Sequence, residues 1–401
     1  MKIKVGVIFG GSSVEHDVSI ITAVQAMENI NQDKYEVVPI YIDKNRCFYT
    51  GNILKMMETY KDFNSNIRFL KKVTLCKKND EFVLLATNSL FNKVVNTIDV
   101  AFPIVHGKGV EDGSLAGYLD SIGIPFVGPS VLGAALGQDK VVQKQVMAAE
   151  GVNIVDYIWF YEDEYVSSES DVLKKIKKLG YPVIVKPARL GSSIGITYVK
   201  SEKEIDEAIN DAITYDEKII VEKVVNNLIE VDCAVLGDHS FMETSLIGKM
   251  ITSNKILTFD DKYINGGGKK GAAKKTSGTV SNAGFKIPAE LDKKIEEQVY
   301  DQAKKAFRAL DLTGVTRFDF LVDSKAKKVY VNEPNTIPGC LAFFFYTPKG
   351  KKYTELLDEL ITLSIKKYKN DQKKVTSFDS NVLSTYGGSK GAKGKFGSKQ
   401  A

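Results

Sequence analysis

Acidic and amide side chains alternate along two strand-like segments near the C-terminal end, TRFDFLV and VYVNEPNTIPG. Because strand side chains alternate between two faces, Arg317 and Asp319 share one face of the first segment. Glu333 and Asn335 share one face of the second in the same way. Hard oxygen ligands suit Mg²⁺ that bridges nucleotide phosphates, and an arginine can stabilise a transferring phosphoryl group. A solvent-exposed patch of ion pairs on a sheet is the alternative interpretation.

A glycine- and serine-rich loop follows the strand-like segment PVIVKP. The strand delivers Lys186, and the loop GSSIG then exposes Ser192 and Ser193 between two glycines. Backbone N–H groups of such a loop can surround a phosphate, and the lysine supplies a compact charge. The spacing differs from the GxxxxGK[ST] of a Walker A loop. An ordinary Gly-Ser turn with an edge lysine is the alternative.

A third segment, KIIVEKVVNNLIE, is an apolar run that ends in charged residues. Glu222, Lys223 and Val225 lie where a strand becomes a linker, so their backbone groups could face an adenine edge. Glu230, further along, could bind ribose hydroxyls. Taken alone, this pattern has low specificity.

Two of the three histidines, His16 and His106, lie in glycine-rich loops after predicted parallel strands. Open α/β sheets bind ligands at such strand ends. The loop GGSSVEHDVS also offers Glu15 to an ammonium group, and HGKGVEDGS offers Glu111 and Asp112. Helix capping is the alternative for both loops, because a serine or an acid before a helix is common.

The elements that position these residues follow from the apolar pattern. A strand over residues 3–9, a glycine turn, helical spacing from Ile20 to Ile30 and the strand-like YEVVPIYI form a βαβ unit, which predicts a parallel sheet. Further on, we predict a mostly antiparallel sheet, a helix over 289–310 and a last helix over 353–369. The predicted domains are 1–130, 131–221, 222–371 with a mobile loop at 259–286, and a flexible Gly/Lys-rich tail at 372–401.

Composition narrows the class of protein. The chain has 401 residues, 43% of them hydrophobic and 26% charged, as in soluble globular proteins of two or three domains. No apolar run approaches the roughly 18 residues that cross a bilayer, and MKIKVGVIFG lacks a signal-peptide pattern. We therefore expect a cytoplasmic protein with no membrane partner. Four cysteines without CxxC spacing argue against a disulfide framework or a structural zinc site.

The net charge of +5 is concentrated in two places. Six lysines and no acid lie between residues 262 and 286, and four lysines and no acid lie between 381 and 401. Without these ten lysines, the rest of the chain is mildly acidic, with a formal charge of −5. A basic face for nucleic acid is therefore not indicated, and we expect no nucleic-acid partner.

The motifs GGSSVEHDVS, HGKGVEDG, QDK, PVIVKP with GSSIGI, FDDKY, TRFDF and NEPNTIPG resemble, in order and spacing, those of D-alanine–D-alanine ligases. The resemblance covers roughly residues 1 to 340 and implies an α/β chain: an ATP-grasp fold behind an N-terminal, Rossmann-like parallel-sheet domain that binds substrate. Residues 131–221 would be the central lid domain. The implied activity is ATP-dependent joining of two D-alanines through an acyl phosphate, giving D-Ala-D-Ala, ADP and phosphate for peptidoglycan, cell-wall biogenesis and cell shape.

The resemblance also implies a role for each candidate residue, a homodimer, and two Mg²⁺ ions that Mn²⁺ can replace. The first amino acid and the reacting groups would be held by Glu15, Ser192, Tyr263, Arg317 and the backbone of Gly339, with His106 and Glu111 near the substrates. ATP would be bound by Lys140, Lys186, Ser193, Glu222, Lys223, Val225, Glu230 and Lys262. Metal would be bound by Asp319, Glu333 and Asn335.

The sequence departs from the family pattern in three places. Phe344 stands where the family has a serine that binds the acceptor carboxylate. Either Thr347 or Lys349 replaces that serine, the segment follows a different path, or the acceptor is D-serine, D-lactate or another small amino acid. Ile229 replaces an arginine beside the ribose-binding position, and the loop YINGGGKKGAAKKTSG is unusually long and glycine-rich. A nucleotide-binding protein without catalysis is a further alternative.

Overall fold

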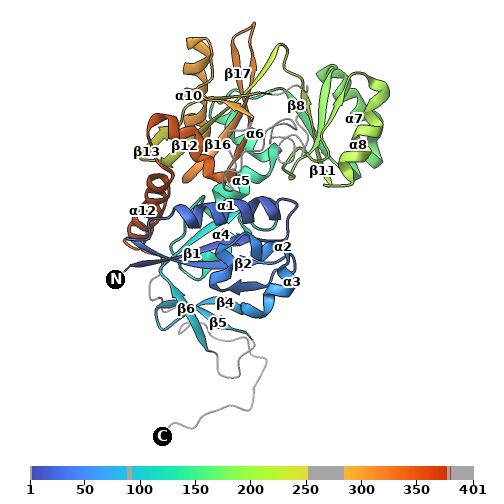
Figure 1. Cartoon of the computed structure of the whole chain (residues 1–401). Helices are drawn as coiled ribbons and strands as arrows, with labels where there is room; N and C mark the ends of the chain where they lie inside the picture. Colours follow the sequence, from blue (N-terminus) through green and yellow to red (C-terminus); the bar gives the residue numbers. More distant parts are fainter. Residues whose placement is uncertain (1, 88–92, 252–283, 377–379, 381–401) are drawn as a thin grey trace, which may run out of the picture.

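The computed structural model describes residues 2–87, 93–251, 284–376 and 380. Within these ranges the strands form three sheets (Figure 1). A seven-stranded sheet has the order β6-β5-β4-β3-β2-β1-β7, and a four-stranded sheet has the order β10-β9-β11-β8. The third sheet has the order β15-β14-β12-β16-β17, with β13 paired to β12. This architecture is mixed α/β, as predicted.

The seven-stranded sheet is parallel only in part. Its strands are β1 (Ile3–Gly10), β2 (Tyr35–Ile42), β3 (Phe48–Thr50), β4 (Lys71–Lys78), β5 (Glu81–Ala86), β6 (Val94–Ile98) and β7 (Val100–Val105). The strand β1 pairs in parallel with β2 and β7, as the βαβ pattern predicts. From β2 through β3 to β6 the pairing is antiparallel, so the expectation of a parallel sheet is wrong for that half.

Helices cover the first sheet and lead into the second. They are α1 (His16–Asn29), η1 (Asn52–Lys55), α2 (Glu58–Lys61), α3 (Phe63–Asn66), η2 (Ile67–Phe69) and α4 (Ser114–Ser121). Two consecutive helices, α5 (Val131–Gln138) and α6 (Lys140–Ala149), follow. The side chain of Asp139 accepts hydrogen bonds from the N–H groups of Val141 and Val142 in the first turn of α6, which fixes where that helix begins.

The four-stranded sheet has its own helices and its own core. It comprises β8 (Tyr157–Tyr161), α7 (Glu162–Leu179), β9 (Val183–Pro187), β10 (Thr197–Val199), η3 (Glu202–Glu204), α8 (Ile205–Ile213) and β11 (Lys218–Lys223). Buried residues from both helices and all four strands, such as Phe160, Ile176 and Ile209, pack into one cluster.

The third sheet contains the longest strand pair of the described chain. Its elements are β12 (Leu228–Asp238), β13 (Phe241–Thr244), β14 (Gly248–Met250), β15 (Phe285–Lys286), α10 (Lys293–Ala309), β16 (Gly314–Asp323) and β17 (Lys328–Asn335). After β17 come η4 (Gly339–Ala342), α11 (Phe343–Tyr346), η5 (Thr347–Lys349) and α12 (Tyr353–Asp371). The antiparallel sheet and the last two long helices are confirmed within a few residues.

One face of the third sheet shares a hydrophobic cluster with the first sheet, and its other face packs against α10 in a cluster of its own. One cluster joins the first sheet to residues of β12, β16, η4 and α12, including Leu236, Val315, Leu341 and Leu357. In Figure 1, α12 runs from the third sheet down beside the first. Asp358 on α12 accepts hydrogen bonds from Lys34 Nζ (2.8 Å) and Tyr35 Oη (2.7 Å). These contacts make the two regions one packed unit.

Two further expectations concern cysteines and membranes. All four cysteines are free thiols, which agrees with the absence of a disulfide framework; Cys233 and Cys340 are buried, and Cys47 and Cys76 are partly exposed. In the described part of the chain, no helix combines the length and apolar character needed to cross a bilayer.

Candidate active site

The neighbouring strands β16 and β17 bring the predicted metal ligands together. Asp319 lies opposite Glu333, and Arg317 lies opposite Asn335. The Asn335 Nδ2 group donates to Asp319 Oδ1 at 3.1 Å. Among the described residues, no three His, Cys, Asp or Glu side chains group as a metal site. The predicted set has two carboxylates and one amide. Their hard oxygen atoms fit Mg²⁺ chemically.

Arg317 is held by two carboxylates. Its Nε lies 2.8 Å from Asp319 Oδ1 and 3.2 Å from Asp232 Oδ2, and a terminal nitrogen donates to Asp319 Oδ2 at 3.1 Å. Asp232 is buried in β12, 2% exposed. Sequence reasoning missed it, although an acid inside the apolar strand VDCAVLG is the signal that could have revealed it. Two acidic partners fix the guanidinium on the face of the sheet that carries the metal candidates.

Two predicted phosphate-binding lysines reach this region from different elements. Lys140, the first residue of α6, lies 3.2 Å from Glu333 Oε2 and donates to the Leu190 carbonyl oxygen at 2.7 Å. Lys186 on β9 lies 2.9 Å from Glu222 Oε2 on β11. Glu222 thus connects the predicted adenine segment to the predicted phosphate lysine.

A third lysine, which sequence reasoning missed, completes this buried cluster. Lys144 is fully buried on α6, and its Nζ lies 3.1 Å from Glu222 Oε1. Burial lowers the pKa of Lys144 despite the attraction of Glu222. Burial also opposes charge on Lys186, but Glu222 and Glu333 together outweigh it and raise the pKa of that lysine. Burial works against the Glu222 carboxylate as well, yet the two lysines lower its pKa.

Glu15 lies where three glycine-containing loops meet. It precedes α1, and the hydroxyl of Ser192 donates to its Oε1. A Cβ atom on Gly107 would lie 3.0 Å from Glu15 Oε2, and one on Gly191 would lie 3.1 Å from it. These positions leave little room for a side chain. The first sheet and the loop after β9 therefore meet at the carboxylate predicted to bind the substrate ammonium group.

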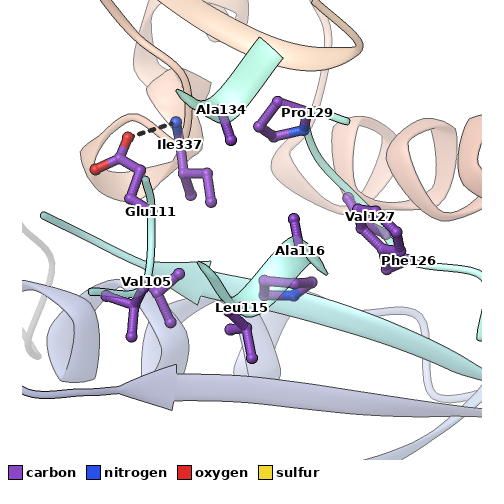
Figure 2. Close-up of a pocket in the computed structure, with 11 residues that line it drawn as sticks. Val105, Glu111, Leu115, Ala116, Phe126, Val127, Pro129, Ala134 and Ile337 are labelled. Carbon is purple, nitrogen blue, oxygen red and sulfur yellow. Dashed lines mark hydrogen bonds between the residues drawn. The ribbon is translucent and has the colours of Figure 1, made fainter. Parts of the chain in front are cut away.

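Glu111 connects the loop after β7 to the segment after β17 (Figure 2). Its carboxylate accepts hydrogen bonds from the backbone N–H groups of Gly107 (2.9 Å) and Ile337 (3.1 Å), and from Thr336 Oγ1 (3.1 Å). It lines a small cavity of about 10 Å³ whose other residues are mostly apolar, including Val105 and Leu115. Burial, followed by the charge of Glu15, raises the pKa of Glu111 to about 7.

The two loop histidines have different environments. His106 is buried, and burial lowers its pKa, so its imidazole is neutral near pH 7. Its Nε2 has no hydrogen-bond partner among the described residues. His16 instead bonds to the Gly11 carbonyl oxygen (2.6 Å) and to Tyr41 Oη (3.0 Å). His16 is therefore a core residue, and His106 is the one with an open hydrogen-bonding position.

The remaining candidates lie around these clusters. Ser193, in the loop after β9, has the left-handed φ of 58°. Lys223 is exposed and Val225 partly buried at the end of β11, and Glu230 is partly buried on β12. A Cβ on Gly339 would contact nothing within 4 Å, which leaves space beside its backbone. Lys262 and Tyr263 lie outside the described residues, as does most of the predicted mobile loop.

The divergent segment after Gly339 forms an aromatic cluster. Cys340, Leu341 and Ala342 have φ values of 51°, 49° and 54°, a left-handed run that is unfavourable for residues with a Cβ. The ring of Phe344 lies 4.5 Å from that of Phe345 and 5.9 Å from that of Phe285, centroid to centroid. Phe344 therefore offers aromatic surface where the resemblance predicts a hydroxyl.

The two proposed replacements for that hydroxyl have local partners. Thr347 Oγ1 donates to the Phe343 carbonyl oxygen at 3.1 Å. Lys349 Nζ donates to the Thr244 carbonyl oxygen at 2.7 Å and lies 3.6 Å from Glu243 Oε1. The Thr347 hydroxyl has a single donor and would have to exchange this bond to donate to an acceptor carboxylate, whereas the Lys349 ammonium has a third N–H group for it.

Comparison with known families agrees with this arrangement. Residues 4–129 match the family described as D-ala D-ala ligase N-terminus, and residues 146–362 match D-ala D-ala ligase C-terminus. The chain belongs to the D-alanine–D-alanine ligase family. A relative from Thermosipho melanesiensis named D-alanine–D-alanine ligase is 36% identical over 384 residues, which are 95% of this chain and 98% of the relative.

Solved structures of the family share the fold. The VanG D-Ala:D-Ser ligase from Enterococcus faecalis has a TM-score of 0.76 and 28% identity, covering 91% of this chain and all of that chain. The D-alanine-D-alanine ligase from Coxiella burnetii also has a TM-score of 0.76, with 27% identity over 93% of this chain and 96% of the other. The predicted ATP-grasp fold is confirmed, whereas the domain limits at 130, 221 and 371 stay a prediction.

Proposed function

We propose that this protein is an ADP-forming ligase that joins two D-alanines to make D-Ala-D-Ala for peptidoglycan. The observation that carries the proposal is the gathering of Arg317, Asp319, Glu333 and Asn335 on one face of β16 and β17, with Lys140 in contact with Glu333. Family membership over most of the chain supports the same activity. The region around the seven-stranded sheet would be the substrate domain, and the region around the four-stranded sheet would be the lid. The region around the third sheet would bind the metal.

The chemistry requires activation of a carboxylate. A carboxylate repels nucleophiles and has no good leaving group, so the γ-phosphoryl group of ATP is first transferred to one of its oxygens and ADP leaves. The amine of the second amino acid then attacks the acyl carbon and loses a proton, and phosphate departs from the tetrahedral intermediate. Positioning and electrostatic stabilisation provide most of the acceleration in such transfers.

The residues would divide these tasks by charge. Glu15, bonded to Ser192, would bind the ammonium group of the first D-alanine. Lys140 and Lys186 would bind ATP phosphates, and Arg317 with the Gly339 N–H would stabilise the oxyanion. His106 and Glu111 lie at the loop that would face the substrates.

The base end of ATP would lie at β11 and β12. Glu222, Lys223 and Val225 would form the adenine pocket, and Glu230 would bind the ribose. Asp319, Glu333 and Asn335 would hold Mg²⁺, which neutralises phosphate charge when bound. Lys262 and Ser193 would bind the phosphates of ATP, and Tyr263 would lie near the first amino acid.

A second candidate function differs only in the acceptor. Phe344 replaces the hydroxyl that the resemblance assigns to the acceptor carboxylate, and one structural relative is named as a D-Ala:D-Ser ligase. D-Serine, D-lactate or another small amino acid would then take the second position. A homodimer and a cytoplasmic location are further parts of the proposal and are implied by the family.

A phosphate-release assay with ATP, Mg²⁺ and a panel of acceptors tests the proposal. D-Alanine should give the highest turnover, with D-Ala-D-Ala as the product identified by mass spectrometry. The variant Glu15→Gln keeps the size of the side chain but removes the negative charge that would bind the ammonium group of the first D-alanine. It should lower turnover at least about 100-fold. Turnover with D-serine but not with D-alanine would favour the second candidate, and ATP binding without any amino-acid-stimulated turnover would overturn both.

A further inference from the structure

Lys144 connects two sheets through one buried ammonium group. Its side chain is fully shielded from solvent on α6. Its Nζ lies 3.1 Å from Glu222 Oε1 on β11 and donates to the carbonyl oxygen of Asn332 on β17 at 3.2 Å. Asn332 immediately precedes the metal candidate Glu333. The ammonium thus joins the edge predicted to bind adenine to the strand predicted to bind metal.

A structural role alone does not account for a charge at this position. A buried ion pair is rarely more stable than apolar side chains of the same volume, because both ions lose their hydration. The same helix places Lys140 one turn earlier, and its Nζ lies 3.2 Å from Glu333. Two lysines on one helical face therefore serve different carboxylates, one at each end of the proposed ATP site.

Glu222 has two ammonium partners before nucleotide binds. Lys186 lies 2.9 Å from its Oε2, and Lys144 lies 3.1 Å from its Oε1. In the proposed function, Lys186 turns to the phosphates of ATP. Lys144, shielded and bonded to the Asn332 backbone, is then the partner that stays with Glu222. A carboxylate this deeply buried would otherwise take up a proton.

We propose that Lys144 is a positioning residue that keeps Glu222 ionised and aimed at the adenine edge, in register with the metal-binding strand. This inference rests on the proposed function. An ionised carboxylate only accepts hydrogen bonds. Adenine offers an amino group at position 6, whereas hypoxanthine offers a carbonyl oxygen that such a carboxylate repels. Lys144 therefore sets the preference for ATP over ITP without touching the nucleotide.

The variant Lys144→Met tests this role, with kcat and KM measured separately for ATP and ITP. We expect the ratio of kcat/KM for ATP to that for ITP to fall at least about tenfold, because a protonated Glu222 can donate to the carbonyl oxygen of ITP. The KM for ATP should rise more than kcat falls. An unchanged ratio in a folded variant would overturn the proposal.

Two further variants separate the possible causes. Lys218→Met is the matched control, because Lys218 is a buried lysine on β11 that pairs with Asp139 at 2.8 Å rather than with Glu222. It should lower thermal stability but leave the ATP-to-ITP ratio unchanged. Glu222→Gln should also lower the ratio. If Glu222→Gln leaves the ATP-to-ITP ratio unchanged, the assignment of Glu222 to adenine fails. If Glu222→Gln lowers the ratio but Lys144→Met leaves it unchanged, only the positioning role of Lys144 fails.

A folding defect in Lys144→Met would also be informative. The double variant Lys144→Met/Glu222→Gln is compared with Glu222→Gln alone, because Glu222 also pairs with Lys186. If Lys144 compensates the carboxylate, Lys144→Met should destabilise the Glu222→Gln protein less than it destabilises the wild-type protein. Equal destabilisation in both backgrounds would show that Lys144 acts only in packing, which overturns the proposal.

Discussion

Glu111 shows how one side chain can serve both a domain contact and a substrate loop. Its three hydrogen-bond donors come from the loop after β7 and from the segment after β17. These donors favour the carboxylate, whereas the apolar cavity and the nearby Glu15 favour the carboxylic acid. The opposition raises the pKa to about 7, so the charge of this contact changes within the physiological range.

We predict that Glu111 makes stability depend on pH. Its pKa rises from the ordinary value of 4.5 to about 7 in the fold, so between these values the folded protein holds a proton that the unfolded chain has released. This contribution is complete below about pH 4.5 and is lost as pH rises through 7. The difference between these two pKa values corresponds to roughly 3 kcal/mol.

Glu111→Gln should remove this part of the pH dependence. Denaturant unfolding of both proteins from pH 4 to pH 8 measures it, because the difference between the two curves cancels the other titrating groups. The curves should converge in the acid range and separate toward pH 8. Parallel curves throughout would contradict the raised pKa.

At the residue scale, sequence patterns predicted some contacts and hid others. The alternation in TRFDFLV and VYVNEPN predicted that Asp319, Glu333 and Asn335 would share a face, because strand geometry has a period of two. Lys144 and Asp232 were missed because their partners are distant in sequence. A lysine in an amphipathic helix usually lies in solvent, and only the packing of α6 between two sheets buries it.

At the element scale, a close approach fixes α5 against the end of β17. A Cβ on Gly137 would lie 2.4 Å from Thr336 Cγ2, and Thr336 is itself buried and bonded to Glu111. The absence of a side chain near the end of α5 therefore lets the helix support the segment that carries Thr336 and Ile337.

We predict that Gly137→Ala destabilises the protein by about 1–3 kcal/mol, because the added methyl group must displace Thr336 in a packed interior. Gly117→Ala in α4 is the matched control, since its Cβ would meet nothing within 4 Å. That control should stabilise by roughly 0.5–1 kcal/mol, the usual gain of alanine over glycine in a helix. Thermal unfolding measures both, and equal effects of the two variants would refute the contact argument.

Sequence reasoning at this scale failed where pairing is not local. The parallel strands β1, β2 and β7 are buried along almost their whole length and read as apolar runs. The strand β4 carries four lysines and alternates buried and exposed residues only in its middle, so its sequence resembles a surface loop as much as the interior strand that it forms. The residues with left-handed φ from Cys340 to Ala342 include no glycine, so the sequence does not indicate this conformation.

At the scale of the whole molecule, segments that are far apart in the sequence pack into the same hydrophobic cluster, and the segment between them forms another. The first sheet and α12 belong to one hydrophobic cluster, although more than 200 residues separate them. The four-stranded sheet, inserted between them in sequence, has a separate cluster. The motifs predicted the kind of domains present, but this pairing of chain ends depends on long-range burial that no local pattern encodes.

We predict that the cluster shared by the first sheet and α12 and the cluster of the four-stranded sheet respond separately to cavity-forming substitutions. Leu357→Ala on α12 should destabilise the first and third sheets by about 2–5 kcal/mol, and Ile209→Ala on α8 should have a similar effect on the four-stranded sheet alone. Hydrogen exchange resolved by segment measures both. Increased exchange throughout the chain in both variants would show one cooperative unit instead.

The shared core also constrains how products leave. The first and third sheets cannot swing apart without exposing their common interior, and Glu111 bonded to Ile337 fastens them beside the site. The four-stranded sheet, whose described core is separate, could move only if Ser192 parted from Glu15 and if its contacts with α6 also gave way. Such a movement would uncover the amino-acid end and the phosphate end together. Dipeptide and spent nucleotide then share one exit, so a single opening rate would limit the release of both.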